Sequence, residues 1–181
     1  KTSIQAIYGT TADFVTYDSV VKSIPAGDYP DHPLSGTFIG GYRPVVAYAE
    51  DVDRVIVGWQ EVQSPNEPMY RIGELDPDGS VTWGDPIALD STNKGLIYDM
   101  AYNPNTGKIQ VVFGREGSTS NVYETKGVSI EINSDKTSTQ DTIQNISGHE
   151  MEYGNLAYDE DTASMYMAYR YKNNDECLVR Q

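Results

Sequence analysis

Hydrophobic and polar positions follow one pattern three times along the chain. Segment 100–114, "MAYNPNTGKIQVVFG", has an apolar run that ends at Tyr102, a Pro-Asn-Thr-Gly turn and an alternating run that ends at Phe113. This pattern predicts a β-hairpin. The same pattern occurs in "VAYAEDVDRVIVGW" at 46–59 and in "LAYDEDTASMYMAY" at 156–169. Three matching hairpins indicate a repeat architecture.

The three hairpins align at spacings of 54 and 56 residues. An Ala-Tyr pair ends the first strand of each hairpin, and a large aromatic residue ends the second strand. We expect these positions to form a repeated core, which consists of Ala47, Tyr48, Trp59, Ala101, Tyr102, Phe113, Ala157, Tyr158 and Tyr169.

The second strand of the middle hairpin predicts how the repeats pack. Ile109, Val111 and Phe113 alternate with neighbours that include Val112 and Gly114. Successive residues of a strand point to opposite faces, and neither set of residues is purely polar. We therefore expect a neighbouring sheet on each face.

A second strand pair follows each of the first two hairpins, at 69–89 and 122–146. A third copy lies at 3–21, and the last hairpin is followed only by "ECLVRQ". Gly, Pro, Asn and Asp recur every 8 to 12 residues, and helical periodicity is nearly absent. The sequence thus predicts an all-β fold of about three four-stranded antiparallel repeats, similar to β-propeller blades and cut in mid-repeat.

We divide the chain into one repeat domain with five segments. The expected segments are the second half of a unit at 1–23, a Pro/Gly-rich insertion at 24–43, a unit at 44–90, a unit at 91–146 and an incomplete unit at 147–181. The incomplete unit is completed either by 1–23 or by a neighbouring copy. We favour a window on a longer array over a closed ring, because three blades are few for a ring.

The charge of the chain excludes some classes of binding partner. The chain of 181 residues has 13 Lys and Arg against 27 Asp and Glu, a formal charge of -14. Such a surface repels phosphate backbones and anionic lipids, so we expect no nucleic acid partner, and no apolar run is long enough for membrane insertion. Cys177 is the only cysteine, so an intrachain disulfide is excluded.

The segment 80–116 shows a family resemblance. A strand ends at Tyr102, an Asn-containing turn follows, and the next strand runs from Lys108 to an aromatic residue and Arg115; a Trp-Gly-x-Pro step starts at Trp83. This pattern resembles the propeller-like repeats of large structural and tail-associated proteins of marine bacteriophages and of some bacterial surface proteins. The resemblance implies a virion or cell-surface location and a role in attachment or particle architecture.

A second likeness is to the Asp-box of sialidase-type propellers. In "DPDGSVTW", Asp78, Thr82 and Trp83 fit that motif, whereas Gly79 comes one position early and Asp76 replaces the leading serine. An Asp-box is a folding motif, so this likeness does not indicate catalysis.

Acidic turns provide the only candidate metal ligands. Three turns cluster carboxylates, namely Glu50 with Asp51 and Asp53, Glu74 with Asp76 and Asp78, and Asp159 with Glu160 and Asp161. None has the spacing of a calcium loop, and aspartate is favoured in turns because its side chain bonds to its own backbone. We therefore assign no metal or cofactor, with Ca²⁺ at these turns as the alternative.

Catalytic residues are not expected. Glycoside hydrolysis needs two facing acids, and among 27 acidic residues some pair is always available. A sialidase-like site also needs converging arginines, but Arg115 and Arg170 lie at nearly equivalent repeat positions, which favours a structural role.

The repeat is broken most strongly at 22–43, where about a dozen residues rich in Pro and Gly are inserted. Insertions in repeat proteins map to loops on one face, which is often the binding face. We therefore name Tyr29, His32, Phe38 and Tyr42 as candidate contacts to a ligand or partner, with a neutral loop as the alternative.

These observations favour a non-catalytic structural or attachment module of a virion fibre, knob or surface appendage. Its expected partners are other protein subunits of a particle or fibre and a cell-surface glycan, and it is expected to be part of an oligomer or larger chain. Two alternatives remain: a carbohydrate-binding or glycan-hydrolysing propeller fragment, and an extracellular filament protein that assembles from tandem repeats.

Overall fold

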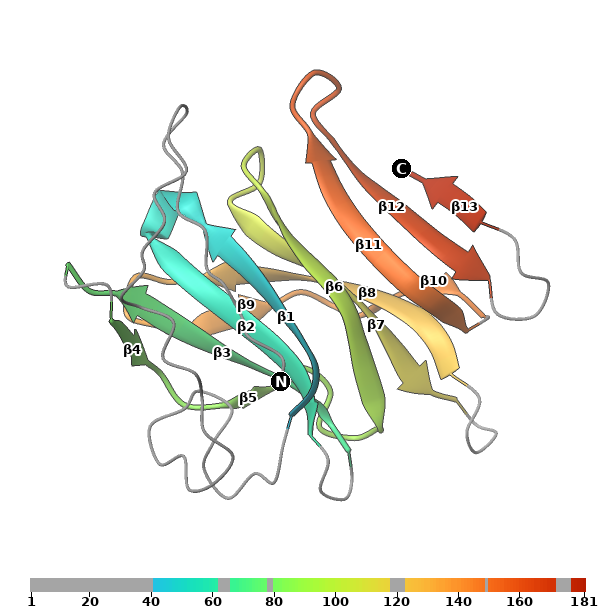
Figure 1. Cartoon of the computed structure of the whole chain (residues 1–181), viewed down its shortest axis with the longest axis horizontal. Coiled ribbons are helices and arrows are strands. Elements are labelled where there is room, and N and C mark those ends of the chain that lie inside the picture. Colours follow the sequence, from blue (N-terminus) through green and yellow to red (C-terminus); the bar gives the residue numbers. More distant parts are fainter. Residues whose placement is uncertain (1–40, 62–65, 78–79, 118–122, 149, 172–176) are drawn as a thin grey trace, which may run out of the picture. The chain divides into compact units, whose positions relative to one another are not determined.

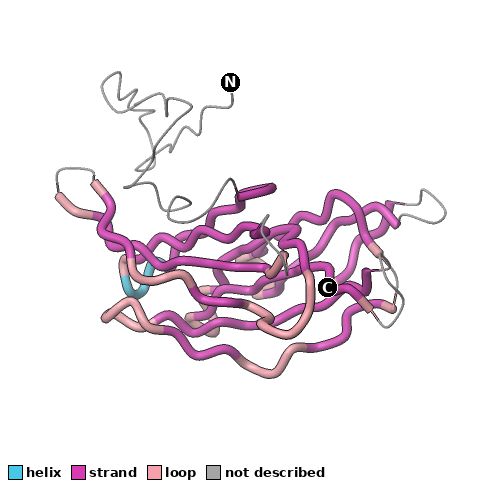
Figure 2. Tube along the Cα trace, turned by 90° about the horizontal axis from the view of Figure 1, so that it is seen from below, coloured by secondary structure: helices cyan, strands magenta, loops and turns pink. Residues whose placement is uncertain are grey.

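The computed structural model describes residues 41–61, 66–77, 80–117, 123–148, 150–171 and 177–181. The chain divides into two units, 1–30 and 31–181, and all described residues lie in the second. Strands dominate this part of the chain (Figure 2). No helix within it is long and apolar enough to cross a membrane. The predicted all-β class with antiparallel sheets is confirmed.

Three sheets follow one another along the chain, and we call them sheets A, B and C. Sheet A contains β1 (Gly41–Ala49), β2 (Arg54–Glu61), β3 (Pro68–Leu75), β4 (Val81–Trp83) and β5 (Ile87–Ala88), with a 3-10 turn, η1 (Glu50–Val52), between β1 and β2. Sheet B contains β6 (Gly95–Asn103), β7 (Lys108–Glu116), β8 (Tyr123–Ile132), β9 (Ser138–Gln140) and β10 (Gln144–Ser147). Sheet C contains β11 (Met151–Asp159), β12 (Ser164–Tyr171) and β13 (Cys177–Arg180).

Sheets A and B have the same topology. In each, the third strand pairs with an outer strand that is divided into two short pieces. The pieces β4 and β5 both pair with β3, and β9 and β10 both pair with β8. In sheet C the third strand is β13, which pairs with β12. Among the described residues, sheet C has no outer strand.

Strand pairing has the same register in the three hairpins. Ala47, Ala101 and Ala157 each lie opposite the residue nine positions further along the chain, namely Ile56, Gln110 and Tyr166. A register irregularity also interrupts each hairpin near the start of its first strand, close to residues 44, 98 and 154. The offsets of 54 and 56 residues therefore describe backbone pairing as well as sequence.

The first strands of the three sheets are neighbours in space (Figure 1). β6 lies between β1 and β11 and contacts both of them. Consecutive sheets consequently face each other. We call the face of each sheet that carries Val57, Val111 or Met167 its leading face, and the face that carries Gly58, Val112 or Ala168 its trailing face.

The main hydrophobic core lies where the trailing face of sheet A meets the leading face of sheet B. Ile56, Tyr70 and Ile72 of sheet A are fully buried there. They pack in one cluster with residues of sheet B that include Ile109 and Phe113. Fully burying such a side chain contributes roughly 1.5–3 kcal/mol, so this interface is the main source of stability.

A smaller core joins the trailing face of sheet B to the leading face of sheet C. Val112 of β7 packs there with Met151, Met167 and Tyr169. Because Val111 belongs to the first cluster and Val112 to the second, the prediction that neighbouring sheets cover both faces of β7 is confirmed.

Most of the predicted repeat core is buried or half-buried. Ala47, Trp59, Phe113 and Tyr169 are buried, and Ala101, Tyr102 and Tyr158 are half-buried.

Tyr48 and Ala157 are exposed, so their prediction as core residues is wrong. Tyr48 lies on the leading face of sheet A and Ala157 on the trailing face of sheet C, the two outermost faces of the three sheets. No described sheet covers either face. The Tyr48 hydroxyl donates instead to the Asp53 carboxylate, at 2.6 Å.

Met100 and Val46 occupy equivalent positions, but only Met100 is covered by a neighbouring sheet. We expect Met100→Ala to lower the free energy of unfolding by about 2–5 kcal/mol, because it leaves a cavity between sheets A and B. Val46→Ala should change it by less than about 0.5 kcal/mol. Urea denaturation of both variants at low protein concentration measures the difference, and equal losses would contradict the packing described above.

Candidate functional site

A cleft of about 750 Å³ lies between sheets B and C, and it is the candidate functional site. Its apolar part is formed by Val112, Leu156 and Met167. Its polar part carries four amide side chains, a carboxylate, a guanidinium group and three hydroxyl groups, which come from β8, from β12 and from the segment between β9 and β10. The polar lining residues are Gln110, Ser129, Asp141, Thr142, Gln144, Asn145, Tyr166, Arg180 and Gln181.

The cleft exists because small residues stand on the trailing face of sheet B. Gly127 and Ser129 of β8 occupy the positions that Tyr70 and Ile72 occupy in β3. In sheet A those two side chains fill the space next to sheet B. Ile146 of β10 partly replaces them, since an added Cβ at Gly127 would lie 2.9 Å from its Cδ1 atom. The second interface is therefore more open than the first.

Hydrogen bonds orient the polar groups along the cleft. The Ser129 hydroxyl donates to Oε1 of Gln110 at 2.8 Å, and Nε2 of Gln144 donates to the carbonyl of Thr142 at 3.1 Å. Nη1 of Arg180 donates to the carbonyl of Ile146 at 3.3 Å, which joins sheet C to sheet B. Amide groups over an apolar floor suit a neutral ligand that offers hydroxyl or peptide groups.

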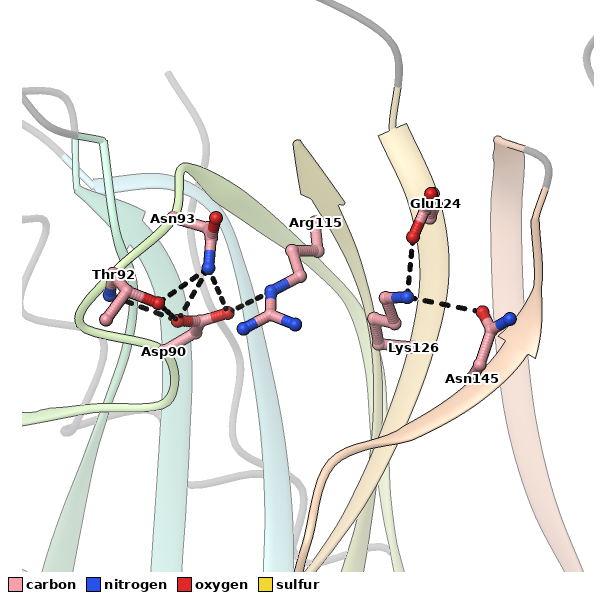
Figure 3. A network of polar contacts seen from close by, with 7 residues as sticks. All are labelled: Asp90, Thr92, Asn93, Arg115, Glu124, Lys126 and Asn145. Carbon is pink, nitrogen blue, oxygen red and sulfur yellow. Dashed lines mark hydrogen bonds and ion pairs between the residues drawn. The ribbon is translucent and has the colours of Figure 1, made fainter. Parts of the chain in front are cut away.

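A charged cluster closes one end of the interface between sheets A and B (Figure 3). The buried Asp90 accepts hydrogen bonds from the backbone amide and hydroxyl of Thr92 and from the Asn93 amide. Its Oδ2 atom also lies 2.6 Å from Nε of Arg115 on β7. Burial acts to raise the pKa of Asp90, but the hydrogen bonds from Thr92, Asn93 and Arg115 together hold this pKa below its ordinary value.

The cluster continues across sheet B. Arg115 lies opposite Glu124 in the pairing of β7 with β8. Nζ of Lys126 contacts Oε2 of Glu124 at 2.6 Å and donates to the Asn145 amide oxygen at 3.3 Å (Figure 3). The hydrogen bond and positive charge of Lys126 lower the pKa of Glu124. These charges are paired with one another, which supports the expected structural role of Arg115.

Arg54 and Arg115 do not gather at one site. The position of Arg54 in sheet A corresponds to Lys108 at the start of β7, and Arg115 lies at the far end of β7. Seven residues of strand separate these positions, which is about 23 Å. Arg54 pairs with Glu74 at 3.4 Å and bonds to the Ser134 carbonyl. Arg54 and Arg115 thus close opposite ends of one interface.

The described acidic turns use their carboxylates for local hydrogen bonds. Asp76 accepts from the hydroxyls of Ser80 and Thr82 at 3.1 and 2.8 Å. Asp159 accepts from the Thr162 hydroxyl and the Asp161 amide, and these hydrogen bonds lower the pKa of Asp159. Within the described ranges, no group of three or more His, Cys, Asp or Glu side chains is arranged to hold a metal ion. The contacts agree with ordinary turn chemistry.

Three of the four residues predicted to contact a ligand or partner lie outside the described residues. Tyr29, His32 and Phe38 lie outside the described residues, as does Asp78 of the acidic turns. Tyr42 was expected in the inserted loop, but it belongs to β1, where it pairs with Gln60. The insertion therefore ends before Gly41, because backbone pairing with β2 already begins there.

No family model and no curated protein matches this chain. Functional inference therefore rests on the described residues and their geometry. The cleft was missed in the sequence, although the change from Tyr70 and Ile72 to Gly127 and Ser129 can be read in the aligned repeats.

Asp90→Asn tests the charged cluster. We expect it to lower the free energy of unfolding at pH 7 by about 1–3 kcal/mol, because it removes the charged partner of a partly exposed Arg115. The folded state lowers the pKa of Asp90, so its stabilising effect is present above the ordinary carboxyl pKa and is lost as the pH falls through the lower folded-state value.

Denaturation at pH 7 and at progressively lower pH should therefore show the wild type and Asp90→Asn converging in acid. Asp141→Asn is the matched control, because Asp141 pairs with Lys108 on the surface and should contribute less than about 1 kcal/mol. An Asp90→Asn effect no larger than that of the control would contradict the role of this cluster.

Proposed function

We propose that the chain is a non-catalytic structural module in which sheets A, B and C act as blades of a propeller-like repeat. The observation that carries this proposal is the shared strand register, combined with the packing of each trailing face on the next leading face. Adjacent first strands and a divided outer strand in sheets A and B agree with blade architecture. In such a module most side chains of the repeat serve packing.

The described polar groups support a structural role. Asp90, Arg115, Glu124 and Lys126 are paired with one another at the end of an interface, and Arg54 joins two sheets at the other end. Hydrolysis of a glycosidic bond requires two carboxyl groups that face a substrate. The lining of the cleft contains one carboxylate, that of Asp141, which forms an ion pair with Lys108.

We further propose that this module belongs to a virion fibre, knob or other surface appendage and contacts protein subunits or cell-surface glycans. The resemblance to propeller-like repeats of phage structural proteins supports this location. The net charge of -14 also suits solubility in a salty or extracellular medium.

A turnover assay tests the non-catalytic proposal. The chain should release no reducing sugar from a panel of polysaccharides and sialylated oligosaccharides. Asp141→Asn is the informative variant, because Asp141 is the carboxylate of the cleft. Turnover by the wild type that is lost in Asp141→Asn would overturn the proposal, and a catalytically inert denatured sample serves as background.

The cleft between sheets B and C supports a second function, the binding of a neutral glycan. Its size lies within the range of ligand sites, and its amide groups can bond to sugar hydroxyls. If the labelled chain retains a neutral oligosaccharide on a glycan array, Ser129→Ile should weaken that binding at least tenfold. The added side chain fills the cleft as Ile72 fills the first interface.

Ser80→Ile provides the matched control for the glycan experiment, because Ser80 is exposed in a turn away from the cleft. It should leave binding unchanged. No retention of neutral glycans by the wild type, or equal losses in both variants, would exclude the cleft as a glycan site.

A further inference from the structure

The two outermost sheet faces each carry exposed apolar side chains. On the face of sheet A these lie beside the buried Trp59 and Met69, and on the face of sheet C they lie beside polar residues such as Asp159 and Ser164. On the leading face of sheet A, the exposed fractions of Val46 and Tyr48 are 59% and 42%. Val55 and Val57 extend the same face on β2. In sheet B the equivalent positions hold Met100, Tyr102, Ile109 and Val111, which pack against sheet A.

The trailing face of sheet C shows the converse situation. Ala157 and Ala168 are exposed, and the exposed fraction of Val179 on β13 is 71%. The equivalent positions in sheet A are Ala47, Gly58 and Tyr70. There Ala47 and Tyr70 belong to the main hydrophobic core, and Gly58 allows Met100 and Ile97 of sheet B to approach closely.

We propose that the trailing face of sheet C binds the leading face of sheet A in a second copy of this chain. The pairing repeats an interface that the chain forms twice within itself, from sheet A to sheet B and from sheet B to sheet C. It would bury three of the four large hydrophobic side chains that are exposed in the described part of the chain, namely Val46, Tyr48 and Val179. This inference rests on the blade arrangement proposed above.

A polar contact between sheets B and C indicates the alignment of the two copies. Oδ2 of Asp99 accepts a hydrogen bond from the backbone amide of Leu156 at 2.6 Å. The residue equivalent to Asp99 in sheet C is Asn155, and the residue equivalent to Leu156 in sheet A is Val46. Asn155 of one copy is therefore placed to accept from the Val46 amide of the next, since an amide oxygen can replace a carboxylate oxygen as acceptor.

The two faces are different surfaces, so the contact is head-to-tail. Each copy in a chain of contacts uses one leading face and one trailing face, which produces a ring or a filament. Each copy also carries a net charge of -14, so repulsion opposes association at low ionic strength. Association should consequently increase when salt screens this charge.

Sedimentation velocity and light scattering of the 181-residue chain over a range of concentrations test the proposal. The wild type should form dimers and larger species as concentration and salt increase. Val46→Lys blocks the leading face, and Val179→Lys blocks the trailing face. Each single variant should associate at least tenfold more weakly than the wild type.

A mixture of the two variants gives the decisive result. Val46→Lys retains its trailing face and Val179→Lys retains its leading face, so an equimolar mixture should form complexes that stop at two chains. A face that bound itself would instead allow one variant to dimerise alone. Thr139→Lys, at an exposed position on β9 outside both faces, should associate as the wild type does.

A wild type that stays monomeric at high concentration and high salt would overturn the proposal. Association that neither lysine variant weakens would also overturn it, as would a mixture that forms no complex. Circular dichroism identifies a variant that fails to fold, in which case Ala168→Lys replaces Val179→Lys and Tyr48→Lys replaces Val46→Lys. Association is measured by mass and the proposed function by turnover, so the failure of one is distinguishable from the failure of the other.

Discussion

The structure depends on the packing of one apolar sheet face against the next. An isolated antiparallel sheet of this size cannot bury enough apolar surface, and a single hairpin is at best marginally stable in water. Sheet B buries apolar surface on both of its faces, because Val111 packs toward sheet A and Val112 packs toward sheet C. The alternation of β7 is therefore a requirement of its position between two sheets. Sheets A and C each have one face buried within the described part and one outer face without a described neighbour.

Polar groups determine how these faces are aligned, since apolar contacts alone would allow neighbouring sheets to slide. Arg54 fixes one end of the interface between sheets A and B through the Ser134 carbonyl, and Asp90 with Arg115 fixes the other. Asp99 fixes the second interface through the Leu156 amide. Each of these groups has a partner because an unpaired buried charge would cost several kcal/mol. This explains why these charged side chains occur at the ends of strands.

The sequence predicted those parts of the fold in which the same pattern of residues recurs. The Ala-Tyr position, the polar turn and the terminal aromatic residue predicted the hairpins, and Trp59, Phe113 and Tyr169 are buried as expected. The sequence predicted the two neighbours of sheet B but not that Tyr48 would be exposed, because Tyr48 and Tyr102 have the same local pattern and differ only in what lies beside them. Burial is decided by contacts between residues that are distant along the chain.

The cleft illustrates a different limit of sequence reasoning. Small residues such as Gly127 and Ser129 are common in strands, and they indicate an open space only when the aligned position in another sheet is large. The insertion before β1 is visible in the sequence because it interrupts the repeat, whereas the cleft lies inside a repeat that is uninterrupted in length.

A repeat can therefore acquire a site without any insertion. Two smaller side chains on one face, Gly127 and Ser129, open the interface without changing the backbone register. Val112 and Met167 still pack together and hold the two sheets in contact. Volume lost from an interface between sheets is tolerated more readily where a second interface supplies most of the stability. The larger core between sheets A and B provides that reserve, so the interface between sheets B and C is the place where this architecture can accommodate a ligand.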